Sequence, residues 1–113
     1  MPATHEDAHL IVQIVRWTTE MGGENAMREL FSEKFDPSAA SVNDESVHKM
    51  LFLGETVGTL VKHGVLDRDL TLDLWWISGA WERVQHAAKR ERDRLGEPRL
   101  FENFEALAKS DRA

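Results

Sequence analysis

The chain has 113 residues, of which 42% are hydrophobic and 30% are charged. This length is sufficient for one domain with one core, over residues 1–113, and the composition excludes a disordered polar tract. The net charge of −6 argues against binding to nucleic acid or to anionic lipid surfaces, and the absence of cysteine excludes disulfides and cysteine metal sites.

The sequence predicts a cytoplasmic protein without a transmembrane segment. A chain without cysteine fits a reducing compartment. The longest apolar run near the N-terminus covers residues 10–15 and is interrupted by Gln13, whereas a membrane span needs about 20 residues. Acidic residues and histidine precede this run, where a signal peptide would carry basic residues, so we expect no secretory signal.

Residues 5–20 are predicted to form the first helix. Thr4 and Asp7 match a capping box, with aspartate in place of the usual glutamate or glutamine. The residues that share one helical stripe are Ala8, Ile11, Ile14, Val15 and Thr18. The β-branched residues of this segment could also indicate a strand, but no other segment offers a strand partner, so we expect a helix.

Glycine and proline separate the next helices. After a Gly-Gly pair, a short second helix is predicted over about residues 24–35, and the segment 36–38 then breaks the chain. The third helix covers about residues 43–63. Its apolar residues and glycines repeat at intervals of three and four, and Gly64 provides a left-handed stop.

The fourth helix begins with Asp67 as its cap and continues to about Leu95, where Gly96 ends it. Its apolar stripe consists of Leu70, Leu74, Ile77, Trp81, Val84 and Ala88. Pro98 lies in the first turn of a fifth helix that reaches about Lys109. We therefore expect an all-α fold, a single helical bundle of four main helices plus one short helix.

The short link at residues 64–66 predicts that the third and fourth helices are antiparallel neighbours. Pairing outward from this link places Gly58 near Leu74 and Gly54 near Ile77. A glycine inside a helix costs about 1 kcal/mol relative to alanine. We therefore expect bulky residues of the fourth helix to approach both glycines closely.

Residues 5–9 read HEDAH, which matches the H-E-x-x-H signature of zinc proteases. In that signature, two histidines one helical turn apart bind zinc, and the glutamate polarises the attacking water. His5, Glu6 and His9 therefore define one candidate activity, that of a metal-dependent hydrolase.

Three features favour a solvated helix start over a zinc site. If Ile11 marks the centre of the buried stripe, His5 and His9 lie roughly 120° to 160° away from it, on the polar side of the helix. The other histidines also point away from their core stripes, and the 20 carboxylates are too many to single out a third ligand. The motif also lies close to the terminus, where chains fray. We expect at most weak metal chelation by His5 and His9.

Trp75 and Trp76 form the second candidate site. The predicted fourth helix is apolar nearly all the way round at this point, and adjacent helical residues point about 100° apart. Such a helix is either enclosed by helices of its own chain or covered by a partner. Because tryptophan is enriched in binding hot spots, the second alternative predicts a homodimer, or a complex with a protein partner, through Trp75 or Trp76.

Residues 87–99, AAKRERDRLGEPR, are rich in arginine, but acidic residues leave the local charge only slightly positive. No aromatic residue is interleaved that could stack on a base. We expect a solvated helix end, whose basic residues complement the helix dipole, in preference to an anion-binding patch.

Several of these segments together resemble a bacterial family catalogued as a domain of unknown function, over about residues 27–109. The matching residues are Gly58, Leu60, Val61, Gly64, Leu66, Asp67, Trp81, Gly96, Pro98, Phe104, Glu105 and Leu107. The resemblance implies that many relatives carry a transmembrane helix on the N-terminal side of this domain. This chain is expected to differ from them, because it has the helix at residues 5–20 in that position. The resemblance implies no activity, cofactor or catalytic residue, and HEDAH lies outside it.

The sequence thus predicts a non-enzymatic protein-interaction or scaffold domain that associates with itself and needs no cofactor. One alternative is the metal-dependent hydrolase of the HEDAH segment. Another is a small-ligand sensor with a pocket among Trp75, Trp76 and the short second helix, although the sequence offers no polar group that converges on such a pocket.

Overall fold

The computed structural model describes residues 2–111, which form six helices and no strand. The helices are α1 (His5–Glu20), α2 (Gly23–Leu30), α3 (Glu45–Lys62), α4 (Arg68–Leu74), α5 (Ile77–Leu95) and α6 (Glu102–Lys109). The predicted all-α fold is therefore confirmed. Within residues 2–111, no helix combines the length and the apolar composition that crossing a bilayer requires.

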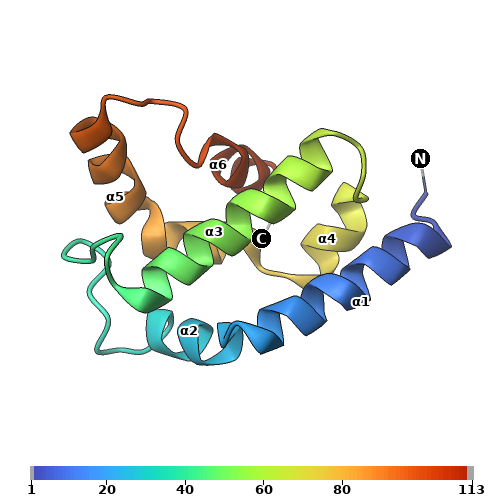
Figure 1. Cartoon of the computed structure of the whole chain (residues 1–113), viewed down its shortest axis with the longest axis horizontal. Helices are drawn as coiled ribbons and strands as arrows, with labels where there is room; N and C mark the ends of the chain where they lie inside the picture. The colour runs from blue at the N-terminus through green and yellow to red at the C-terminus, as the bar shows by residue number, and fades with distance from the viewer. Residues whose placement is uncertain (1, 112–113) are drawn as a thin grey trace.

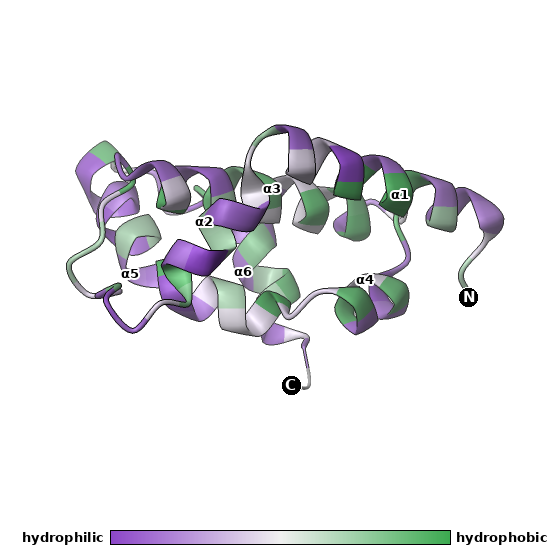
Figure 2. Ribbon diagram, turned by 90° about the horizontal axis from the view of Figure 1, so that it is seen from below, coloured by the Kyte–Doolittle hydropathy of each residue, from purple (hydrophilic) through white to green (hydrophobic). Residues whose placement is uncertain are grey.

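Helix α3 crosses the middle of the molecule, with α1 and α2 along one side and α5 and α6 on the other (Figure 1). It packs against α2, α5 and α6. Hydrophobic and hydrophilic residues alternate along α1 and α5, as expected for helices that bury one side (Figure 2). The largest fully buried apolar side chains, which mark the core, are Phe104, Leu30, Leu51, Leu66, Val47 and Val84.

The long helix predicted from Asp67 to Leu95 is two helices, because the chain leaves the helical conformation at the tryptophan pair. Trp75 is extended, with φ −120° and ψ 140°, and Trp76 has a ψ of 76°. The predicted start is correct, since the Asp67 side chain accepts a hydrogen bond from the backbone N–H of Leu70 at 2.8 Å. The break lets Trp75 pack against the core while Trp76 turns to the surface.

Two other predicted boundaries are wrong, because side chains distant in sequence bind the helix ends. Helix α2 ends at Leu30, whose carbonyl accepts a hydrogen bond from Arg83 Nε at 2.6 Å. Pro98 lies in a turn rather than in a first helical turn, and α6 begins at Glu102. There the carboxylate of Glu55 accepts hydrogen bonds from backbone N–H groups of α6.

Gly54 and Gly58 do allow a close approach to α3, but the approaching element is α6. A Cβ atom at Gly54 would lie 2.3 Å from the ring of Phe104, and one at Gly58 would lie 2.4 Å from the carbonyl oxygen of Asn103. The predicted approach of the fourth helix to these glycines is therefore wrong. The break at the tryptophan pair redirects the chain, and α6 takes the place beside α3.

Candidate functional site

The two histidines of the HEDAH segment are exposed on α1. His9 Nε2 lies 2.9 Å from the side-chain amide nitrogen of Gln13, one turn further along the helix. Within residues 2–111, no three His, Cys, Asp or Glu side chains come close enough to hold a metal ion. Metal binding by His5 and His9 stays a prediction that this arrangement does not test.

Asp7, in the middle of the same segment, has a structural role. It completes the predicted capping box: Thr4 N donates to Asp7 Oδ2 at 2.8 Å, and Asp7 N donates to Thr4 Oγ1 at 3.1 Å. These hydrogen bonds, from the backbone of Thr4 above all, lower the pKa of the Asp7 carboxyl. Its second oxygen accepts a hydrogen bond from the backbone of Asp67 at 2.9 Å, so Asp7 also joins α1 to the start of α4.

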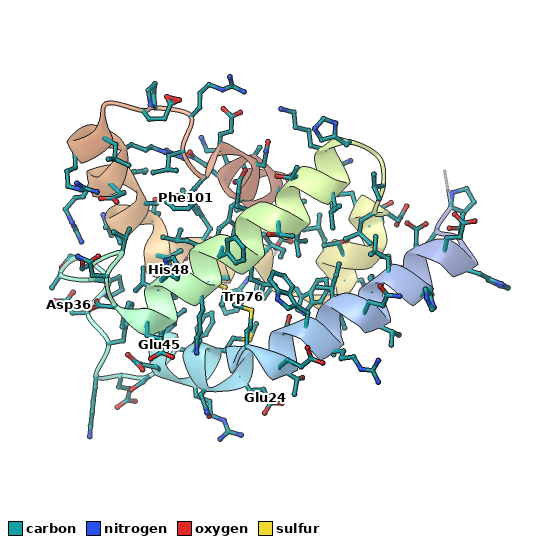
Figure 3. The ribbon with its side chains drawn as sticks, viewed as in Figure 1. Glu24, Asp36, Glu45, His48, Trp76 and Phe101 are labelled. Atoms are coloured by element: carbon teal, nitrogen blue, oxygen red, sulfur yellow. The ribbon has the colours of Figure 1, made fainter. Side chains whose placement is uncertain are left out.

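Trp76 is the most exposed aromatic residue near the break, with 60% of its surface accessible. Its ring stacks on Phe31, with centroids 5.8 Å apart and planes 18° from parallel. The indole also covers Gly79, where a Cβ atom would lie 2.4 Å from it. Figure 3 shows Trp76 in the space between α2 and α3. Because both tryptophans lie outside a helix, the prediction that they are adjacent residues of one helix, about 100° apart, is wrong.

A hollow of about 360 Å³ opens beside this aromatic pair, and we call it the aromatic groove. Its lining residues come from α2, α3, α6 and the junction of α4 with α5. They are Met27, Phe31, Met50, Leu53, Gly54, Val57, Leu74, Trp75, Trp76, Ile77, Ala80 and Phe104. None of these side chains is ionisable, so the groove offers apolar contact and no acid or base for catalysis.

The lining residues divide into a floor and a rim. Met50, Leu53, Val57, Ile77, Ala80 and Phe104 are buried and form the floor. Phe31, Leu74 and Trp76 are exposed and form the rim. Phe104 is fixed from behind by an edge-to-face contact with Trp81, with ring centroids 5.1 Å apart. The sequence indicated Trp75, Trp76 and the short second helix, which was predicted to include Phe31, for such a hollow, but it did not indicate that Phe104 lines it.

A wider hollow of about 630 Å³ lies between α3, α4 and α6. Its charged lining residues are Lys62 and Arg68, both exposed, and Glu102, which is paired with Arg99 at 3.1 Å. Charges of both signs thus share an open surface, where solvent screens them. We therefore consider the aromatic groove the better candidate site.

The arginine-rich stretch binds backbone carbonyl groups of the same chain. Arg90 donates to the carbonyl of Ser38 at 2.9 Å and to that of Ala40. Arg92 donates to the carbonyl of Leu100 at 2.7 Å and pairs with Glu105 at 2.8 Å. The expected solvated helix end is therefore wrong for Arg92, whose side chain is only 14% exposed, whereas Arg90 is exposed as expected.

Together with Arg83, which lies seven residues earlier on the same face of α5, Arg90 holds the segment between α2 and α3. The spacing of seven is a signal that sequence reasoning could have used to place both side chains on one face.

The family model described as Domain of unknown function (DUF4760) matches residues 3–110. This confirms the resemblance to a domain-of-unknown-function family. The match also includes residues 5–9, so HEDAH lies within the family region, and its expected position outside that region is wrong. No curated protein and no solved structure matches the chain.

Proposed function

The chain belongs to the family described as Domain of unknown function (DUF4760), and from this premise we propose that it is a non-enzymatic protein-interaction domain that self-associates through the rim of the aromatic groove. The observation that supports this proposal is the exposure of Trp76, at 60% of its surface. Tryptophan is enriched among residues that contribute most of the binding energy at protein interfaces.

The neighbours of Trp76 add to this argument. Leu74 is 50% exposed and Phe31 is 42% exposed, and both line the same groove. Isolated apolar residues are common on protein surfaces, but a contiguous group that includes two stacked aromatic rings is typical of an interaction site. A second copy of the chain that packed on this rim would remove all three side chains from water.

Size-exclusion chromatography with light scattering at increasing protein concentration tests self-association. We expect a dimer whose population rises with concentration, and a monomer for Trp76→Ala. Phe52→Ala is the matched control, because Phe52 is also exposed, at 55%, but lines no part of the groove. A wild-type chain that stays monomeric at the highest concentration would remove the self-association proposal.

A further inference from the structure

We propose that the floor of the aromatic groove binds the hydrocarbon chain of a small ligand, with no charge inside the groove. This inference goes beyond self-association, because it concerns the buried floor and would hold for a monomer. It rests on the volume of the groove, on the chemistry of its lining, and on the contacts that keep it open.

The volume fits a small molecule. Protein interiors pack densely, with few voids larger than a water molecule. The groove measures about 360 Å³, which lies within the usual range of small-molecule pockets of about 300–1,000 Å³. Since water occupies about 30 Å³ per molecule and a methylene group is of similar size, the groove has room for a chain of about ten carbon atoms.

The lining selects for hydrocarbon. No lining side chain carries a charge that could neutralise an ionised group, and burial of an unpaired charge is strongly unfavourable. Met27 and Met50 contribute unbranched, flexible side chains, which adapt to apolar ligands of irregular shape. A polar head group of the ligand would therefore stay at the rim, in contact with water, while the chain contacts the floor.

Contacts outside the groove hold its walls in place. Before the tryptophan pair, Asp67 caps the start of α4. After the pair, the backbone N–H of Ser78 donates a hydrogen bond to the carboxylate of Asp111 at 3.1 Å. At the floor, Gly54 allows the ring of Phe104 to lie directly against α3. The hollow is thus part of the folded architecture and does not depend on a partner to form it.

The test measures affinity as a function of chain length. The uncharged fluorescent probe N-phenyl-1-naphthylamine is bound to the wild-type protein and displaced with a series of 1-alkanols. We expect the affinity to rise about fourfold per methylene group, which corresponds to the transfer of one methylene from water. The rise should stop near a chain length of about ten carbon atoms, where the groove is full. Decanoate should bind no more tightly than 1-decanol, because the lining offers no cation to attract its carboxylate.

Two variants locate the site. Ala80→Leu adds carbon atoms to the floor, so the length at which the affinity stops rising should shorten by about three carbons. Trp76→Ala removes a rim aromatic contact and should weaken binding of the longest alkanols by up to about tenfold. Phe52→Ala should match the wild type. Circular dichroism and thermal melting confirm that each variant is folded. If Ala80→Leu does not fold, the chain length at which the affinity of the wild type stops rising decides whether alkanols bind in the groove.

The outcomes separate this proposal from self-association. A chain-length limit near ten carbon atoms supports the ligand site. If light scattering shows a monomer in the same experiment, self-association is refuted while the ligand site stands. Absence of saturable binding overturns the ligand site whatever the oligomeric state. An affinity that rises without limit, or that is unchanged in Ala80→Leu, means adsorption to the surface and also overturns it. Displacement of bound alkanol on dimer formation would mean that a side chain of the second copy occupies the groove, and it would overturn the ligand site.

Discussion

The carboxylate of Glu55 holds the N-terminal end of α6, and its replacement by alanine tests how the groove floor is kept in place. Glu55 Oε1 accepts hydrogen bonds from the backbone N–H groups of Asn103 and Phe104, both at 3.0 Å. Its other oxygen accepts one from the side-chain amide of Asn103 at 2.9 Å. Helix α6 has no cap of its own, since Phe101 precedes it in the left-handed conformation with φ 61°.

The expected loss follows from these contacts. A hydrogen bond to a charged group contributes about 1.5–3 kcal/mol, and loss of a helix cap costs about 1 kcal/mol. Because Glu55 is only half-buried, water can replace part of its contribution, and we expect Glu55→Ala to lower the free energy of unfolding by about 3 kcal/mol. Glu55→Gln keeps an acceptor oxygen but not the charge, so it should lose about half as much.

Urea denaturation followed by circular dichroism measures this loss, and the melting temperature should fall by about 12 °C in Glu55→Ala. Glu33→Ala is the control, because it removes a carboxylate from an exposed position between α2 and α3 and should change stability by less than about 0.5 kcal/mol. If Glu55→Ala and the control lose the same stability, with equal denaturant slopes, the carboxylate does not hold α6 and the reasoning fails.

Four further predictions follow from other contacts. Gly58→Leu should lower the free energy of unfolding by about 3 kcal/mol in the same assay, because its side chain would collide with the backbone of α6. Arg83→Lys should increase hydrogen exchange in the segment between α2 and α3, since lysine cannot bind the same group of carbonyls. The hydrogen bonds to Thr4 lower the pKa of the Asp7 carboxyl. The Asp7 carboxylate therefore stabilises the fold fully above pH 3.8, the ordinary pKa of aspartate, and this stabilisation is lost as the pH falls through the lower pKa of the folded state. Urea denaturation of Asp7→Asn at a series of pH values should show a flatter dependence of stability on pH in this range. Elemental analysis of untagged protein should find no bound zinc, and zinc that disappears in His9→Ala would contradict this.

The residues that carry the family resemblance have structural roles. Gly58 allows α6 to approach α3, and Phe104 forms the groove floor. Gly96 ends α5 in the left-handed conformation, with φ 65°. Glu105 pairs with Arg92 and Lys109. The pattern therefore describes how α5 and α6 are fixed against α3, which is the framework that positions the aromatic groove.

The sequence by itself determined the features that depend on near neighbours along the chain. Thr4 and Asp7 cap α1, and Asp67 caps α4, through hydrogen bonds that span three residues. The three- and four-residue periodicity likewise indicated α3 within two residues at each end. These signals are readable because both partners of each interaction lie within one helical turn.

Only the tertiary structure decided where α2 ends, where α4 gives way to α5, where α6 begins and which residues form the groove. The partners in those cases are far apart in sequence: Glu55 and Asn103 are separated by 48 residues, and Arg83 and Leu30 by 53. Helical periodicity continues through the tryptophan pair, so no local pattern predicts the break there. Local propensity differs by only a few tenths of a kcal/mol per residue, which is less than a single long-range hydrogen bond to a charged group contributes, so the packing of distant segments overrides it.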